Sequence, residues 1–271
     1  MTEVKKYLVG GAVRDHLLGV PSKDHDYVVV GLDFDGLRDW LIADGYEIVQ
    51  ETPAFYTIKA RKTREVLDFV VPRREGPYSD GRHPDWVEKG TLEDDLRRRD
   101  FTVNAMAMDD DGKIIDMFNG QRHLAERKLV TVGKPMVRFN EDPLRAYRAV
   151  RFAVTKGLTI DAKVDAALLR PDLIELVRSP ALSVERIREE LVKAFSKDTI
   201  LTMHLLNRYM GLTVAAVEKG LWFKPTSEKV SGGPKGPKQN LPPASNGCTC
   251  ECHFIPGVNH IVACCYLEQE S

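Results

Sequence analysis

The first thirty residues predict two strands joined through a glycine turn and a short helix, and this order constrains the fold more than any other part of the chain. Residues 7–9 form an apolar run typical of a strand, and Gly10-Gly11 follows as a turn. Residues 12–18 are expected to be helical, and residues 26–30 form a second apolar strand. This order predicts a small sheet with helices packed against it.

The same mixed pattern continues through the first third of the chain. Asp33 is the expected N-cap of the next helix, and three short strands are expected at 47–51, 55–60 and 65–71. Residues 72–91 are rich in proline, glycine and charge and are too long for an ordinary connection. We therefore expect a mobile functional loop there.

From Glu141 onward the pattern becomes helical. Glu141-Asp142-Pro143 is typical of a helix start, because acidic residues favour the positive end of the helix dipole and proline favours the first turn. Further helices are expected at about 161–169 and 183–196, and helical propensity continues to about residue 218. We predict an α+β protein, with a small mixed sheet and helices in a first domain at 1–138 and an all-helical second domain at 139–222.

The end of the chain has a different composition. Residues 223–247 are rich in Pro, Gly, Ser and Lys and predict a flexible linker, and residues 248–271 form a Cys/His-rich tail. Thiolate and imidazole groups suit Zn²⁺, but C-x-C-x-C is not the usual zinc spacing, so a flexible tail without metal is the alternative. The candidate zinc ligands are Cys248, Cys250, Cys252, His253, His260, Cys264 and Cys265.

Composition excludes several classes of protein. All 5 cysteines lie in the tail, so the rest of the chain cannot depend on disulfides, which fits a reducing compartment. No apolar run is long enough to span a bilayer or to act as a secretory signal, and we expect a cytoplasmic protein without a membrane partner. The formal net charge of −1 gives no overall attraction to nucleic acid. Nothing in the sequence indicates the oligomeric state.

Asp24 and Asp26 stand one residue apart at the entrance to the strand at 26–30. Side chains alternate between the faces of a strand, so the two carboxylates are expected to point the same way and to bind Mg²⁺, which prefers oxygen ligands and substrate phosphates. A solvated turn is the alternative for a bare Asp-x-Asp. Gly11 lies thirteen residues upstream in a strand, turn and helix start that offers backbone N–H groups to a phosphate, and this favours a site.

The stretch LVGGAVRDHLLGVPSKDHDYVVVG resembles the opening of the nucleotidyltransferases of the polymerase β superfamily, in particular the class II tRNA CCA-adding enzymes and the bacterial poly(A) polymerases. The later stretches LEDDLRRRDFTVNAMAMD, DMFNGQRHL, EDPLRAYRAVRFA and LSVERIREEL occur in that family's order. The likeness covers roughly residues 5–195. It implies a polymerase β-like head at 1–138, followed by a helical neck that binds nucleotide and RNA.

The resemblance also implies an activity. The expected function is template-independent addition of CCA to tRNA 3′ ends from CTP and ATP, with Mg²⁺ as cofactor and release of pyrophosphate. Addition of poly(A), of A alone or of CC alone is the alternative within the family, and a catalytically silent RNA-binding module is the alternative outside the enzymes. Full-length members add helical regions that grip the tRNA elbow, and residues 224–271 are not expected to supply them.

Two arginine-rich motifs complete the candidate site. Arg97-Arg98-Arg99-Asp100 joins cations suited to a triphosphate with a carboxylate that can accept hydrogen bonds from ribose hydroxyls, although a basic helix face is the alternative. In EDPLRAYRAVRFA, an aspartate and three arginines recur every third residue, which places them along one flank of a helix. Solvated surface arginines are the alternative there. The resemblance implies nucleotide binding by Gly10, Gly11, Arg14, Arg99, Asp100, Asn104, Asp142, Arg145, Arg148 and Arg151.

The resemblance implies that Asp142 and Arg145 recognise the incoming base, and hydrogen bonding explains how they could do so. Cytosine and adenine each carry an exocyclic amine beside a ring-nitrogen acceptor, so Asp142 can accept from the amine and Arg145 can donate to the ring nitrogen. Uracil and guanine present the opposite pattern. Asp68, on an expected strand, is the candidate third catalytic carboxylate beside Asp24 and Asp26, and an ion pair with Arg64 or Arg73 is the alternative. The segments at 116–120 and 182–191 are expected to act as scaffold.

Overall fold

The structure is a computed structural model that describes residues 3–22, 25–78 and 83–222. All of them belong to one compact unit, Met1–Phe223. Asp24, the predicted linker and the predicted Cys/His tail with its zinc ligands lie outside the described residues.

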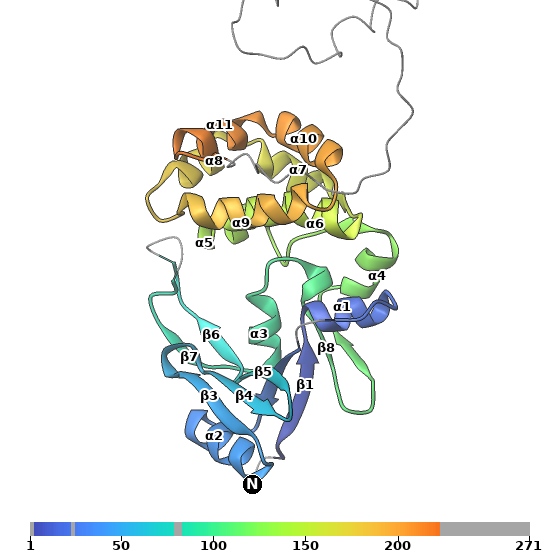
Figure 1. The fold of residues 1–271 in the computed structure, drawn as a ribbon, viewed down its shortest axis with the longest axis vertical. Coiled ribbons are helices and arrows are strands. Elements are labelled where there is room, and N and C mark those ends of the chain that lie inside the picture. The colour runs from blue at the N-terminus through green and yellow to red at the C-terminus, as the bar shows by residue number, and fades with distance from the viewer. Residues whose placement is uncertain (1–2, 23–24, 79–82, 223–271) are drawn as a thin grey trace, which may run out of the picture. The chain divides into compact units, whose positions relative to one another are not determined.

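Within the described residues, seven strands form one sheet in the order β3-β4-β5-β2-β1-β8-β9 (Figure 1). Strands β2 and β5 are parallel, and the other neighbouring pairs are antiparallel. The expected small mixed sheet is therefore confirmed. The strands are β1 Lys5–Val9, β2 Asp26–Val30, β3 Glu47–Thr52, β4 Thr57–Lys62, β5 Glu65–Val70, β8 Met106–Met108 and β9 Ile114–Asp116.

Both faces of the central strand β2 are covered. Val29 packs with Leu37 and Leu41 of α2 (Phe34–Ala43), and Val28 packs on the opposite face with Leu96 of α3 (Leu92–Arg97). A strand buried on both faces carries a continuous apolar run rather than an alternating one, which explains the sequence YVVV. The predicted cap of α2 is also confirmed, since Asp33 accepts a hydrogen bond of 2.8 Å from Gly36 N–H.

The segment at 72–91, expected to be a mobile functional loop, contains two strands that were not predicted. Strands β6 (Arg73–Glu75) and β7 (Val87–Lys89) pair as an antiparallel ribbon. Arg74 and Glu88 are opposite each other in the register and form a hydrogen-bonded ion pair. The facing residues of this ribbon are mostly charged and include the like-charged pair Arg73 and Lys89, so its sequence carried no apolar strand pattern.

Helices fill the second half of the unit (Figure 1). The expected helices after Glu141, at 161–169, at 183–196 and onward to about 218 are present, but α5 and α8 were not predicted. Each begins with proline in its first turn, which is a start signal, but both helices are short. The helices are α5 Pro135–Glu141, α6 Leu144–Lys156, α7 Ala162–Leu168, α8 Pro171–Arg178, α9 Val184–Phe195, α10 Thr199–Arg208 and α11 Met210–Glu218.

The two halves are joined by short elements. Strand β10 (Lys128–Leu129) runs parallel to β11 (Thr159–Ile160), so the part expected to be all helical contains one short strand. Helix α1 (Gly11–Leu17) lies beside β8 at this junction, and helix α4 (Gly120–Ala125) contacts α1 and β10 (Figure 1). Asp116 accepts hydrogen bonds from the N–H groups of Gly120 and Gln121, which supports its expected scaffold role.

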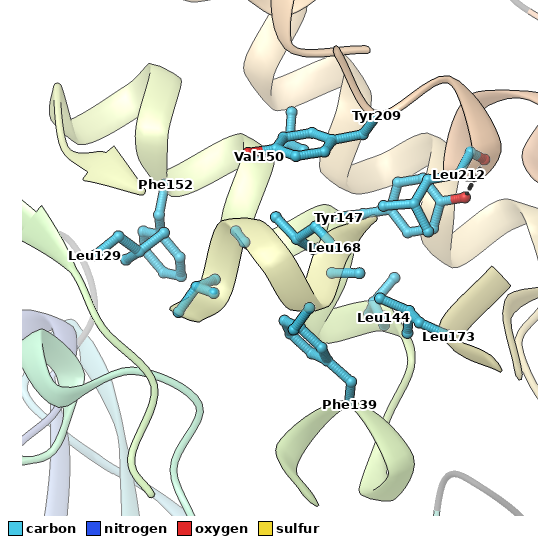
Figure 2. Packing of buried hydrophobic residues seen from close by; sticks show 14 of the residues in the cluster. Leu129, Phe139, Leu144, Tyr147, Val150, Phe152, Leu168, Leu173, Tyr209 and Leu212 are labelled. Atoms are coloured by element: carbon cyan, nitrogen blue, oxygen red, sulfur yellow. Dashed lines mark hydrogen bonds between the residues drawn. The ribbon is translucent and has the colours of Figure 1, made fainter. Parts of the chain in front are cut away.

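The largest apolar core lies around α6 (Figure 2). Tyr147 and Val150 are buried in it, and the Tyr147 hydroxyl donates a hydrogen bond of 2.8 Å to the Leu212 carbonyl. Because one face of α6 is fixed in this core, the arginines on another face are held in place. Among the described residues, no helix is both long and apolar enough to cross a membrane.

Candidate active site

An open, charged cavity of about 540 Å³ lies between the sheet and the helices. On the side of the sheet, the cavity is lined by the turn after β1 and the segment after α3. On the side of the helices, it is lined by α6 and α9. Seven arginines and three aspartates face it, so it favours an anion. Its lining residues are Gly10, Gly11, Arg14, Asp26, Arg98, Arg99, Asp100, Asn104, Asp142, Leu144, Arg145, Arg148, Arg151, Phe152 and Arg186.

This lining brings together every predicted site residue except Asp68, which is one strand away, and Asp24, which is outside the described residues. A second cavity of about 600 Å³ lies among α6, α7 and α10. Its charged groups, Asp165 and Arg208, are paired with each other at 2.6 and 2.8 Å. We therefore place the candidate site in the charged cavity.

The glycine turn lets two arginines approach the backbone closely. Gly10 has φ of +75°, and a Cβ atom there would lie 2.6 Å from Nη1 of Arg99. A Cβ on Gly11 would lie 3.2 Å from Nη2 of Arg14. Glycine is therefore required at position 10 for its backbone angle and for the contact with Arg99.

We expect Gly10→Ala to destabilise the fold by about 1–3 kcal/mol, because alanine is strained at this backbone angle and must displace Arg99. The matched control is Gly19→Ala, where φ is +67° and no atom lies within 4 Å of the added Cβ. Urea denaturation of both variants measures the difference. Equal losses of stability would show that the contact with Arg99 contributes nothing.

The buried Asp95 holds the two arginines that follow α3. Its carboxylate accepts hydrogen bonds from Arg98 at 2.7 Å and from Arg99 at 3.0 Å. Burial opposes ionisation of Asp95, but the two guanidinium groups keep its pKa below the ordinary value. Nε of Arg99 is buried and has no hydrogen-bond partner within the described part of the chain.

Asp100 is the centre of a second network. Its carboxylate accepts hydrogen bonds from Phe101 N–H at 2.7 Å, from Asn104 Nδ2 at 3.0 Å, and from Nε and Nη2 of Arg148, the first at 2.8 Å. Four donors fill the acceptor positions of a carboxylate, so a ribose hydroxyl would have to replace one of them. Burial alone would raise the pKa of Asp100, but Arg148 and the hydrogen bonds lower it to about 2.

This depressed pKa predicts how stability depends on pH. The ionised form of Asp100 is favoured in the folded state, so its contribution is present above the unfolded pKa of about 4 and is lost as pH falls toward 2. We expect Asp100→Asn to cost about 2 kcal/mol at pH 6 and much less near pH 2.5. Urea denaturation of both proteins across this range measures the difference. A difference that does not change with pH would refute the assignment.

Two of the three predicted catalytic carboxylates lie within the described residues and are neighbours. Parallel pairing of β2 and β5 places Asp26 opposite Asp68 on one face of the sheet. Nζ of Lys59 lies 3.2 Å from Oδ2 of Asp68 and 3.1 Å from Oδ1. The expected alternative partners of Asp68, Arg64 and Arg73, are wrong, because the register of β4 and β5 places Lys59 opposite it.

These carboxylates fit a magnesium ion. Oδ1 of Asp68 is buried and accepts no hydrogen bond, despite the nearby ammonium group, and carboxylate oxygens are the ligands that Mg²⁺ prefers. Within residues 3–22, 25–78 and 83–222, no group of three or more His, Cys, Asp or Glu side chains is arranged to hold a metal. The fit to Mg²⁺ therefore rests on a pair of carboxylates. Such a pair is sufficient when substrate phosphates supply further ligands to the ion.

The arrangement expected for the second arginine motif is corrected at one residue. Asp142 is not helical, because proline at 143 disfavours helical angles in the residue before it, and its φ and ψ are −146° and 104°. Arg145, Arg148 and Arg151 do lie on α6. Each has an acidic partner, which relieves their mutual repulsion. The pairs are Arg145 with Glu141, Arg148 with Asp100, and Arg151 with Glu190.

The expected base-recognition pair is present but is not in mutual contact. Asp142 accepts hydrogen bonds from Leu144 N–H at 3.1 Å and from Nη2 of Arg186 at 2.9 Å. The guanidinium of Arg145 donates instead to Glu141 and to the carbonyl of Arg98 at 3.0 Å. These contacts and a hydrogen bond to the carbonyl of Arg138 use three of the five N–H groups of the Arg145 guanidinium, which lines the cavity together with Asp142.

Four lining residues were missing from the predicted site: Arg98, Leu144, Phe152 and Arg186. Arg186 lies in the segment 182–191, which is expected to act as scaffold, and in the structure it donates a hydrogen bond to Asp142. The ring of Phe152 lies 4.1 Å from the guanidinium carbon of Arg151 and 5.4 Å from that of Arg14. The sequence signal for Phe152 was its place next to Arg151 in the arginine-rich motif, because guanidinium groups stack on aromatic faces.

Comparisons with known proteins agree with this geometry. A family model described as the poly(A) polymerase head domain matches residues 6–130. A multifunctional CCA protein from Neisseria gonorrhoeae is 42% identical over 196 residues, which are 70% of this chain and 44% of that protein. The chain thus spans less than half the length of this relative.

Solved structures have the same fold. The CCA-adding enzyme of Bacillus stearothermophilus in complex with CTP has a TM-score of 0.66 and 32% identity, over 77% of this chain and 49% of that one. A tRNA nucleotidyltransferase complexed with a primer tRNA and an incoming ATP analog has a TM-score of 0.66 and 29% identity, over 82% of this chain and 61% of that one. The chain belongs to the nucleotidyltransferase family that includes the CCA-adding enzymes and the bacterial poly(A) polymerases.

Proposed function

We infer that this chain carries the nucleotidyltransferase centre that adds CCA to tRNA 3′ ends from CTP and ATP, with release of pyrophosphate. The observation that carries this proposal is the charged cavity, which gathers Asp26, the cationic groups suited to a triphosphate, and the pair Asp142 and Arg145. Relatives named as CCA-adding proteins support the choice of tRNA as primer. In this proposal residues 1–138 act as the head and residues 139–222 as the neck.

The sheet half would bind the triphosphate and support the chemistry. Arg14 and Arg99 lie against the glycine turn, where their guanidinium groups would stabilise the charge that leaves as pyrophosphate. Asp24 and Asp26 would hold Mg²⁺, with Asp68 beside Asp26, and the bound ion would lower the pKa of the primer 3′-hydroxyl and neutralise the α-phosphate. Arg148 and Arg151 would hold the nucleotide from α6, with Asp100 and Asn104 orienting Arg148 and meeting the ribose.

The helical half would select the base. Asp142, oriented by Arg186, would accept from the amine of cytosine or adenine, and Arg145 would donate to the ring nitrogen with one of its remaining N–H groups. Uracil or guanine would leave these groups unpaired, at roughly 1–3 kcal/mol each. The protein itself would therefore take the place of a template.

Addition of poly(A) is the second candidate, since the matching family model describes a poly(A) polymerase head domain. The decisive experiment supplies the protein with Mg²⁺, each nucleoside triphosphate, and tRNAs that end before the first C, before the second C and before A. Incorporation of C, C and then A supports CCA addition. Long A tails support the polymerase, and the absence of incorporation, with retained RNA binding, supports a silent module.

A further inference from the structure

Asp15 lies between two cations that come from different halves of the unit. Oδ1 of Asp15 accepts a hydrogen bond of 2.9 Å from Nε of Arg14, its neighbour on α1. Nζ of Lys156, the last residue of α6, lies 2.9 Å from the same oxygen and 3.2 Å from Oδ2. The side chains of Arg14, Asp15 and Lys156 are 6%, 12% and 24% exposed, so water screens this cluster weakly.

We propose that Lys156, acting through Asp15, is a positioning residue for Arg14 and so for the triphosphate. This inference rests on the proposed function, in which Arg14 binds phosphate. It assigns a role to a lysine that lies outside the lining of the charged cavity.

The first argument is electrostatic. A carboxylate bonded to Arg14 alone would neutralise much of the positive charge that a phosphate needs. Lys156 pairs with the same carboxylate, so the three groups together keep one positive charge. The cluster can therefore fix Arg14 through Asp15 and still present a cation to the cavity.

The second argument is geometric. Phe152 and Lys156 are four residues apart on α6 and therefore lie on one face of the helix. The ring of Phe152 lies 5.4 Å from the Arg14 guanidinium carbon, and Lys156 meets the adjacent Asp15. One face of α6 thus contacts both residues of the Arg14-Asp15 pair and fixes the position of α1 against α6.

The third argument is the continuity of the network. Nη1 of Arg14 donates to the side-chain oxygen of Asn104, whose amide donates to Asp100, and Asp100 in turn holds Arg148. If Arg14 moves, Arg148 on α6, which faces the same cavity, is therefore expected to move as well. Loss of Lys156 is expected to weaken binding of the phosphates without changing which base is preferred.

The test uses Lys156→Met in the full chain. We expect the Kd values of CTP, ATP and inorganic tripolyphosphate each to rise about tenfold, because the lost contact orients a group that binds phosphate. Lys156→Arg should restore binding, since it keeps the charge. The matched control is Lys163→Met, an exposed lysine on α7, which should bind like the original protein.

Several outcomes would overturn the proposal. These are an unchanged Kd for tripolyphosphate in Lys156→Met, a higher Kd for CTP but not for ATP, or a Kd that stays high in Lys156→Arg. Urea denaturation shows whether Lys156→Met is folded. If it is not, Lys156→Gln replaces it, because glutamine keeps a hydrogen-bond donor without the charge. The same tenfold rise in Kd is expected. Binding is measured without turnover. A protein that binds tripolyphosphate but adds no nucleotide therefore refutes the proposed function alone.

Discussion

Asp26→Asn is expected to reduce nucleotide addition by about 10³-fold or more, while the protein stays folded. The substitution keeps the shape of the side chain but replaces a carboxylate oxygen by an amide group that repels a cation, so the charge at the proposed Mg²⁺ site is lost. Asp26 is the first residue of β2 and is only partly buried, so the loss of stability should be small. Incorporation of CMP and AMP into a tRNA primer measures the effect.

The control for this prediction is Asp39→Asn, which removes an exposed carboxylate from α2. It should leave incorporation unchanged. A Mg²⁺ titration adds an independent measurement, since the affinity for CTP should rise with Mg²⁺ in the original protein and much less in Asp26→Asn. Full turnover in Asp26→Asn, or an unchanged response to Mg²⁺, would remove Asp26 from the metal site.

Local sequence patterns predicted those parts of the fold that depend on nearby residues. The strand at 26–30 has the predicted bounds in the structure, because an apolar run buried on both faces is unambiguous. The ribbon of β6 and β7 was missed, since its facing residues are mostly charged and show no apolar alternation. Asp142 was placed on a helix by spacing alone, although the proline after it excludes that conformation.

The sequence predicted most residues of the candidate site but not the ion pairs that they form. Arg148 is separated from Asp100 by 48 residues, and Arg151 from Glu190 by 39. Such pairs follow from the tertiary fold and leave no local pattern in the sequence. The charge state of the cavity was therefore beyond prediction, because it depends on which arginines are already paired.

Asp142→Asn is expected to relax the choice of base. A carboxylate can only accept hydrogen bonds, so it suits the amine of cytosine and rejects the carbonyl of uracil. An asparagine amide can present either its oxygen or its amine to the base. We expect the preference for CTP over UTP, measured as the ratio of kcat/KM values, to fall by about 10- to 100-fold, because one unpaired polar contact is removed.

Arg148→Lys separates base recognition from phosphate binding. Arg148 faces the same cavity from the next turn of α6 but pairs with Asp100 rather than with Asp142. Its replacement should lower kcat/KM for CTP and UTP by the same factor and leave their ratio unchanged. Arg186→Gln, which removes the charge that orients Asp142, should lower the ratio by less than Asp142→Asn. A ratio that is unchanged in Asp142→Asn would mean that the base is recognised elsewhere in the cavity.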